Sequence, residues 1–286
     1  MLLPPRRIPT LTVAIPASTV AETPHLREKT SRLGFIGRLL ALFRVDEVII
    51  YSDLSEHQEP KLIETILSYM VTPQYLRRTL FKITPELRFS GILPPLRTPN
   101  HPLTKHVSKL KPGEFRQGLV TGRKGEFSLL DIGVEKPALV KGKHPLNSIL
   151  NVKILAVENG EITAETVKKE DIPLYWGFKV KSEKTSISKI IENGEYDLTI
   201  ATSKYGEPLE QVEEEIFLRW RKARRVLVAF GSPYEGLREI LSKERLSLDE
   251  VFNYTVNTVR FQGVETVRIE EAIASTLALL NYIIPG

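Results

Sequence analysis

The chain has 286 residues, no cysteine and a formal net charge of +5 at pH 7. This length suits one large or two smaller domains, and the lack of cysteine excludes disulfides, thiolate metal ligands and a cysteine nucleophile. No apolar run is long enough to span a bilayer, and the basic pair near the N-terminus follows the short apolar run instead of preceding it. We therefore expect a cytoplasmic protein with no membrane partner.

The first part of the chain alternates predicted strands and helices, an order that favours a parallel sheet with right-handed crossovers. Gly34 and Gly37 lie inside the first predicted helix, and this spacing predicts close packing against another backbone. The elements in chain order are a strand at Leu11–Ala17, a polar loop at Thr23–Thr30, a helix to about Arg44, a strand at Asp46–Ser52, and helices at Lys61–Met70 and Pro73–Phe81.

The pattern changes near Pro85, where several prolines end the helical rhythm. Five short, glycine-punctuated strands follow between Gly113 and Lys169, and Asn159-Gly160 is a hairpin signal. They predict a small barrel of the oligonucleotide-binding (OB) type, although a β-sandwich or meander has nearly the same pattern. The expected strands lie within Phe115–Gly122, Gly125–Gly133, Lys136–Gly142, Leu150–Gly160 and Glu161–Val167.

The positive charge is concentrated in this middle segment. From Arg97 to Lys143 there are ten Lys or Arg and four Asp or Glu, a balance of +6, so the remainder of the chain carries 5 − 6 = −1. A basic segment suggests a polyanionic partner, and a solvated surface is the other interpretation.

The α/β rhythm returns at about Ile172. The last helix begins with Glu270 and Glu271, where the helix dipole favours negative charge. We expect one α/β domain formed by residues 1–90 and 171–286, with residues 91–170 inserted as a β-barrel domain. The predicted elements are strands at Trp176–Val180, Asp197–Thr202, Arg225–Phe230 and Asn253–Val256, helices at Ile187–Ile191, Leu209–Arg219 and Tyr234–Leu241, and a final helix that buries Ile273, Leu277, Leu280 and Ile284.

Three polar loops of this last part are candidates for ligand binding. They are Thr202–Gly206, the turn at Gly231-Ser232-Pro233 and the loop that starts at Asn257. A glycine at the carboxyl end of a strand lets a ligand approach the backbone. Neither a dinucleotide fingerprint nor a phosphate-binding P-loop is present. Taken singly, the Thr202–Gly206 loop and the turn at Gly231 are better explained by a tight turn or a cap.

Four separated stretches carry a family resemblance: LREKTSRLGFIGRLLALFRVDEVIIYSD (Leu26–Asp53), YDLTIATSKYG (Tyr196–Gly206), VLVAFGSPYEGLREIL (Val226–Leu241) and Asn257–Asn281. Together they resemble the SPOUT class of RNA methyltransferases, in the archaeal and eukaryotic branch with an inserted β-domain. The resemblance implies a knotted α/β domain of parallel-sheet type with an inserted OB-like barrel, and S-adenosyl-L-methionine as the cofactor. Val259-Arg260-Phe261 departs from the small or proline-containing run often found in that branch. The departure affects the expected shape of this loop and not its presence.

The resemblance also implies which residues hold the cofactor, through backbone hydrogen bonds to the adenine and an apolar slot for its ring. Asn257 or Thr202 would serve the ribose or the methionine end. The implied cofactor-binding residues are Thr202, Ser203, Lys204, Gly231, Asn257, Gln262, Gly263, Val264, Thr266 and Val267.

Substrate handling is expected from the LREKT motif. Arg27 would bind a phosphate or lower the pKa of the acceptor, Glu28 would take a proton, and Lys29 belongs to the same catalytic group. The alternative is a helix start with solvated charges. Arg268 is a further catalytic candidate, or else pairs with Glu270 or Glu271. The histidines are too dispersed for a metal site.

These observations predict an S-adenosylmethionine-dependent RNA methyltransferase that acts on ribosomal RNA, with uridine N3 as one candidate acceptor. RNA would bind the basic insertion, and a homodimer is expected from the family and from the wide apolar surface of Leu33–Phe43. The alternatives are a non-catalytic RNA-binding or ribosome-assembly protein and a different α/β ligand-binding enzyme.

Overall fold

A computed structural model describes residues 3–284, which fall into two compact units. One unit contains a β-barrel and comprises residues 3–6, Thr72–Thr84 and Leu96–Gly177. The other contains a parallel sheet and comprises Arg7–Val71, Pro85–Pro95 and residues 178–284. The barrel unit includes helix α3 (Gln74–Leu80), which lies before the expected insertion at 91–170. This helix is attached to the barrel: the hydroxyl of Tyr75 in α3 donates a hydrogen bond to the carbonyl of Gln117 in the first barrel strand at 2.6 Å.

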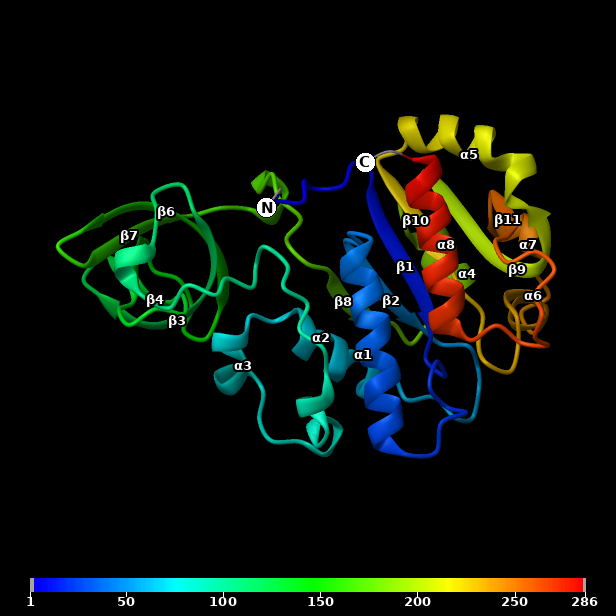
Figure 1. Ribbon diagram of the computed structural model, residues 1–286, viewed down its shortest axis with the longest axis horizontal. Helices are drawn as coiled ribbons and strands as arrows, with labels where there is room; N and C mark the ends of the chain where they lie inside the picture. Colours follow the sequence, from blue (N-terminus) through cyan, green and yellow to red (C-terminus); the bar gives the residue numbers. More distant parts are fainter. Residues whose placement is uncertain (1–2, 285–286) are drawn as a thin grey trace. The chain divides into compact units, whose positions relative to one another are not determined.

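The sheet unit is built on six parallel strands in the order β11-β9-β10-β1-β2-β8 (Figure 1). The central strands β1 and β10 pair from Thr10 with Arg225 to Ala14 with Ala229. Because all strands run the same way, the loops that follow them begin at one edge of the sheet, where ligands of α/β proteins bind. The bounds are β1 Thr10–Pro16, β2 Glu47–Tyr51, β8 Lys179–Ser182, β9 Leu198–Pro208, β10 Arg225–Ala229 and β11 Tyr254–Asn257.

Helices cover this sheet, and α1 and α8 lie side by side in front of it in Figure 1. Helices α4, α6 and α7 pack on the sheet residues Ala14, Leu227 and Ala229. Within residues 3–284, no helix is long and apolar enough to cross a membrane. The bounds are α1 Leu26–Leu42, α2 Pro60–Val71, α4 Ile187–Asn193, α5 Leu209–Lys222, α6 Leu237–Ser242, α7 Leu248–Val251 and α8 Ile269–Ile283.

The two glycines of α1 allow close packing, but not against a backbone as predicted. A Cβ on Gly34 would lie 2.9 Å from the Cδ of Pro94, and one on Gly37 would lie 2.8 Å from the sulfur of Met70. The predicted partner was wrong because the neighbouring segments approach α1 with their side chains.

The barrel closes through five strands in the order β3-β4-β5-β7-β6, with β6 returning to β3. Apolar side chains from all five strands fill its interior. The hairpin predicted at Asn159-Gly160 is confirmed, since both residues have positive φ (48° and 75°) and join β6 to β7. The bounds are β3 Phe115–Lys124, β4 Phe127–Asp131, β5 Ala138–Lys141, β6 Ile149–Glu158 and β7 Glu161–Thr166.

Candidate functional site

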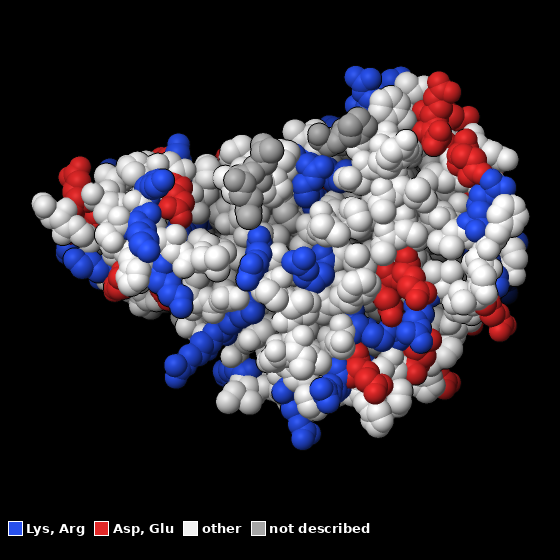
Figure 2. Space-filling model, in the orientation of Figure 1, with Lys and Arg blue, Asp and Glu red and all other residues white. Residues whose placement is uncertain are grey.

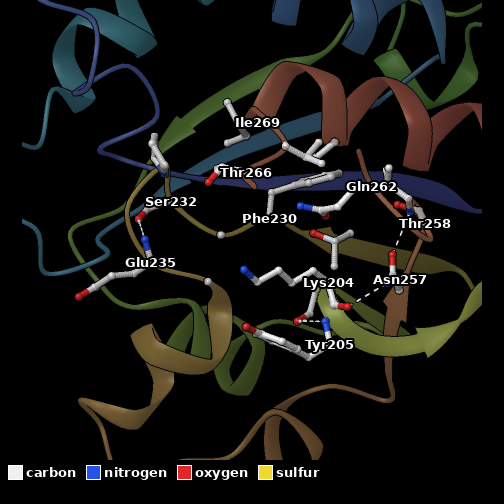
Figure 3. A pocket seen from close by; sticks show the side chains of 18 of the residues that line it. Lys204, Tyr205, Phe230, Ser232, Glu235, Asn257, Thr258, Gln262, Thr266 and Ile269 are labelled. Atoms are coloured by element: carbon white, nitrogen blue, oxygen red, sulfur yellow. Dashed lines mark hydrogen bonds between the residues drawn. The ribbon is translucent and has the colours of Figure 1, made fainter. Parts of the chain in front are cut away.

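Three loops at the carboxyl edge of the sheet enclose a pocket of about 360 Å³ (Figure 3). They are the outer part of β9, the β10–α6 loop and the β11–α8 loop. The structure thus brings to one place three segments that lie far apart in the sequence. The implied cofactor residues that line the pocket are Thr202, Ser203, Lys204, Gly231, Asn257, Gln262, Thr266 and Val267.

Two implied residues of the last loop, Gly263 and Val264, do not line this pocket. The side chain of Val264 is 59% exposed, and a Cβ on Gly263 would meet nothing within 4 Å. The structure therefore places the tip of this loop away from the pocket, while the residues on either side of the tip face it.

The first loop is part of strand β9, contrary to the prediction that the strand ends at Thr202. The pairing with β11 jumps from Ala201–Thr255 to Glu207–Val256, so Thr202–Gly206 leaves the ladder as a long bulge. Bulges of this kind redirect side chains next to active sites. Gly206 allows the return, because a Cβ there would lie 2.7 Å from the backbone carbon of Val256.

The second loop is held by one buried hydrogen bond from strand β2 and by a turn within the loop. The buried Tyr51 hydroxyl of β2 donates to the Phe230 carbonyl at 2.7 Å. Ser232 accepts from the amide of Glu235 at 2.9 Å, and its own amide donates to the Glu235 carbonyl at 2.8 Å. This turn occupies the start of the predicted helix at Tyr234, so α6 begins only at Leu237.

The third loop is tied to the first by Asn257. Its side-chain amide donates to the Lys204 carbonyl at 2.9 Å, and its oxygen accepts from the Val259 amide at 3.0 Å. Gln262 similarly donates to the carbonyls of Val264 and Glu265 at 2.8 and 2.9 Å. The side chains of Asn257 and Gln262 thus shape the pocket wall by bonding the protein backbone.

The pocket lining is mixed in chemistry. Phe230, Thr266 and Ile269 lie across the cavity from Lys204 and Tyr205 in Figure 3. Sequence reasoning missed the part of this wall that lies outside the three candidate loops, because a residue at a strand end or in a helix has the same local pattern whether it lines a pocket, a core or the surface. The missed residues include Phe230, Tyr234, Glu235, Glu239, Ile269 and Ala272.

The chain matches the sequence profile of a family described as "Putative RNA methyltransferase" over residues 10–280. The chain belongs to this family of RNA methyltransferases. The match confirms the SPOUT resemblance and covers both the sheet unit and the barrel.

Individual relatives cover nearly the whole methyltransferase. A Halobacterium salinarum protein whose name states no activity is 33% identical over 95% of this chain and 99% of its own. The 28S rRNA (uridine-N(3))-methyltransferases of Mus musculus and Homo sapiens are each 30% identical over 95% of this chain, and the alignments span 76% and 78% of those proteins.

The LREKT motif of the methyltransferase does not reach the pocket within one copy of the chain. It forms the first turn of α1 instead of a loop, because Leu26 already starts the helix and the Thr30 hydroxyl donates to the Leu26 carbonyl at 2.8 Å. Arg27 and Glu28 are exposed, and Lys29 forms an ion pair with Glu59.

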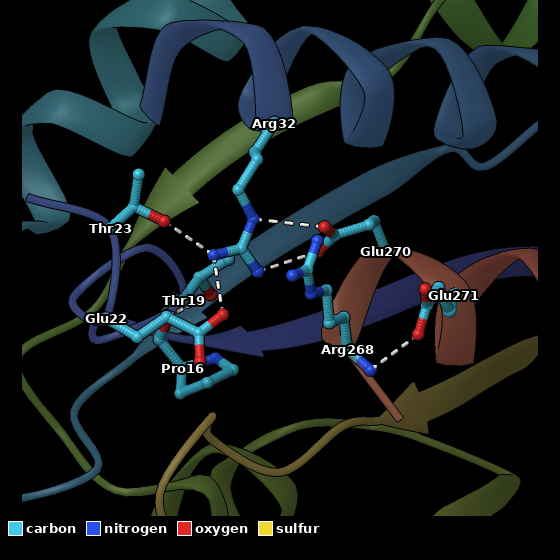
Figure 4. Close-up of polar contacts among 8 residues, drawn as sticks. All are labelled: Pro16, Thr19, Glu22, Thr23, Arg32, Arg268, Glu270 and Glu271. Atoms are coloured by element: carbon cyan, nitrogen blue, oxygen red, sulfur yellow. Dashed lines mark hydrogen bonds and ion pairs between the residues drawn. The ribbon is translucent and has the colours of Figure 1, made fainter. Parts of the chain in front are cut away.

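An ion-pair network that sequence reasoning missed joins α1 to the first turn of α8, which follows the third loop (Figure 4). Arg32 of α1 donates from Nε and Nη2 to the two carboxylate oxygens of Glu270 at 3.0 and 2.9 Å. Its Nη1 donates to Glu22 and Thr23 at 2.6 and 2.7 Å. Burial alone would lower the pKa of Arg32, but the hydrogen bonds and charges of Glu270 and Glu22 raise it above its usual range.

Arg268 stands at the start of α8 and does not line the pocket. Its backbone amide donates to the Glu271 carboxylate at 2.9 Å, which caps the helix. Glu270, which was a predicted partner of Arg268, is instead 7% exposed and engaged with Arg32.

A buried carboxylate, Asp53, follows β2 at the same sheet edge and is 1% exposed. It accepts a hydrogen bond from Ser18, and its second oxygen has no hydrogen-bond partner in the described part of the chain. Burial raises the pKa of Asp53 despite the Ser18 hydrogen bond, with a lesser contribution from the charge of Glu235. No cluster of three or more metal-ligating side chains occurs within residues 3–284.

Proposed function

We propose that the methyltransferase transfers a methyl group from S-adenosylmethionine to a ribosomal RNA base, and that uridine N3 is the acceptor. The observation that carries this proposal is the single pocket built from three strand-end loops. The activity of the mouse and human relatives, which their names give as 28S rRNA (uridine-N(3))-methyltransferase, supports rRNA as the substrate and uridine N3 as the acceptor.

The residues of the pocket suit S-adenosylmethionine in size and chemistry. A volume of about 360 Å³ is within the range of small-molecule sites. The apolar side chains of Phe230, Val267 and Ile269 suit an adenine ring, and the carboxylate of Glu239 suits the positive charge of a sulfonium or an ammonium group. When bound, the cofactor supplies an activated methyl group on sulfur. Thr202, Ser203 and Gly231 would contact it directly, whereas we assign Asn257 and Gln262 to positioning the loops.

The acceptor nitrogen of uridine carries a proton that must leave, and Glu28 with Arg27 remains our proposed catalytic pair. Both are exposed and lie outside the pocket of their own copy. We therefore propose that they, with Lys29 and Arg268, act on RNA held where two copies of the chain meet. The first turn of α1 would then face the pocket of the second copy.

The proposed homodimer is supported by an apolar surface on α1 and α8. Phe35 and Leu42 are 51% and 63% exposed on α1, and Leu279 and Tyr282 are 37% and 84% exposed on α8. These helices lie side by side (Figure 1). Exposed apolar side chains on two neighbouring helices support an interface between copies of the chain.

Two features of the fold support its assignment to the knotted class. Strand β11 returns to the far side of β9 before α8 crosses to α1, which is compatible with the proposed trefoil knot. The five barrel strands close in the order expected for an OB fold. All five lie between residues 91 and 170, which supports the proposed insertion of these residues into a domain of residues 1–90 and 171–286, although the barrel unit also includes residues 72–84 and 171–177.

RNA binding by the barrel is supported by charge and by an exposed aromatic ring. Lys and Arg side chains are spread over the barrel on the face shown in Figure 2. Phe127 is 39% exposed and lies in register with Lys124 on one neighbouring strand and Lys141 on the other. A ring between two ammonium groups suits a stacked base and its phosphates.

Calorimetry with S-adenosylmethionine tests the proposal, with Gly231→Trp as the blocking variant. We expect micromolar binding that the variant abolishes, since a Cβ at Gly231 already lies 3.0–3.1 Å from the backbone of Gly236, Glu235 and Leu237. Circular dichroism of both proteins separates a blocked pocket from a misfolded one. A folded wild-type protein that does not bind the cofactor contradicts the proposal, and mass spectrometry of rRNA nucleosides from a deletion strain identifies the base.

A further inference from the structure

Each of the three pocket loops carries one exposed aromatic side chain. Tyr205 in the β9 bulge is 64% exposed, Tyr234 in the β10–α6 loop is 57% exposed and Phe261 in the β11–α8 loop is 90% exposed. Tyr205 and Tyr234 line the pocket, and Phe261 precedes Gln262, which also lines it. We call these three side chains, Tyr205, Tyr234 and Phe261, the aromatic rim. Phe261 does not line the pocket, so the binding of a small cofactor does not explain its exposed ring.

Phe261 is held in this exposed position at a conformational cost. Its φ is +50°, which is a rare backbone conformation for a bulky residue and is typical of functional sites. The Arg260 guanidinium lies 4.8 Å from the Phe261 ring centre and forms an ion pair with Glu210 at the start of α5. Together with the two hydrogen bonds of Gln262, these contacts preorganise the loop with its ring in solvent.

The aromatic rim is accompanied by cations. The Lys204 ammonium lies 5.1 Å and the Arg238 guanidinium 5.7 Å from the centre of the Tyr205 ring. Of the acidic residues in the pocket wall, Glu235 is neutralised by an ion pair with Lys243. Exposed rings beside Lys and Arg bind unpaired nucleotides, because rings stack on bases and cations neutralise phosphates.

We propose that the aromatic rim binds unpaired RNA nucleotides and holds the acceptor base over the pocket. The inference rests on the proposed function. N3 of uridine lies on the pairing edge of the base, so it is inaccessible in a duplex and the base must be unstacked before methyl transfer. Stacking on the rim replaces the stacking that the base and its neighbours lose, at about 1–3 kcal/mol per base. The rim therefore selects single-stranded or looped RNA.

Fluorescence anisotropy with a labelled oligouridylate, alone and annealed to oligoadenylate, tests the aromatic rim. Phe261→Asn removes the ring and keeps a residue that tolerates positive φ, so the loop is retained. We expect this variant and Tyr234→Ala to weaken single-strand binding about tenfold each, because 1.4 kcal/mol corresponds to a factor of ten. Duplex binding, which depends on the basic surface, should change less than twofold. The matched control is Leu218→Ala, which removes a 51% exposed apolar side chain from α5.

Photo-crosslinking with 4-thiouridine RNA gives a second measurement that does not depend on a folded variant. Crosslinks to peptides containing Tyr205 or Phe261 support the proposal. Crosslinks confined to the barrel, or an unchanged single-strand affinity in Phe261→Asn, overturn it. Calorimetry with S-adenosylmethionine separates a failure of the rim proposal from a failure of the proposed function. Phe261 lies outside the pocket wall, so the Phe261→Asn variant should bind the cofactor within twofold of wild type.

Discussion

Replacing Arg32 by Met tests whether the ion-pair network between α1 and α8 supports the cofactor pocket. The change keeps most of the apolar stem of the side chain and removes the guanidinium. Glu270 is then left without its guanidinium partner in a site where its side chain is only 10% exposed. Glu270 follows Val267, which lines the pocket, by three residues. A shift of the first turn of α8 would therefore alter the cofactor site.

The expected loss of stability is about 3–5 kcal/mol, the range found when one partner of a buried ion pair is removed. The structure places this pair in that range because both side chains are largely buried, at 15% and 10% exposed, and meet through two parallel hydrogen bonds of 3.0 and 2.9 Å. An exposed pair would contribute at most about 1 kcal/mol. We also expect weaker S-adenosylmethionine binding in the folded variant.

Urea unfolding followed by tryptophan fluorescence measures this loss in the sheet unit alone. The chain has two tryptophans, and the buried Trp220 lies in the sheet unit whereas Trp176 lies in the barrel unit. A Trp176→Phe background therefore reports on the unit that contains Arg32. The double variant Arg32→Met with Glu270→Leu should recover most of the stability, since no buried unpaired charge remains. Glu22, the other acidic partner of Arg32, is 34% exposed and can be solvated. A loss below about 1 kcal/mol, or a double variant less stable than either single one, would refute the reasoning.

Three further predictions concern the support of the pocket. Tyr51→Phe leaves the buried Phe230 carbonyl unpaired and should cost about 1–3 kcal/mol in urea unfolding; a loss below experimental error would contradict this role. Gly206→Ala should weaken cofactor binding in calorimetry, since its Cβ would lie 2.7 Å from backbone, whereas Gly91→Ala, with nothing within 4 Å, serves as the neutral control. Asp53→Asn should stabilise the protein at pH 7. Because the pKa of Asp53 is raised in the folded protein, its charge destabilises the fold above that pKa, and this destabilisation is absent below the ordinary pKa of about 3.9. The gain in stability from Asp53→Asn should therefore vanish near pH 3. An equal gain at pH 7 and pH 3 would argue against this explanation.

Local patterns in the sequence were sufficient for most elements of the fold. The apolar run at Leu11–Ala17 predicts β1, and the alternation around Asn159-Gly160 predicts the β6–β7 hairpin. These predictions succeed because the period of apolar residues and the φ preference of turn residues are properties of a few neighbouring positions. The same patterns did not predict that β9 runs to Pro208, because Glu207 and Pro208 at its end pair with β11, which lies more than 40 residues later.

The sequence by itself determined the fold class, the strand-end loops and, through four matching stretches, the family of this methyltransferase. Only the tertiary structure decided how those loops meet, because the order β11-β9-β10 is a matter of strand pairing between distant segments. It also revealed the bond from Tyr51 to Phe230 and the pair of Arg32 with Glu270, which lie 179 and 238 residues apart in the chain. A charged or aromatic residue has the same local pattern whether it faces solvent, a partner or a pocket, and only its position in the folded chain distinguishes these cases.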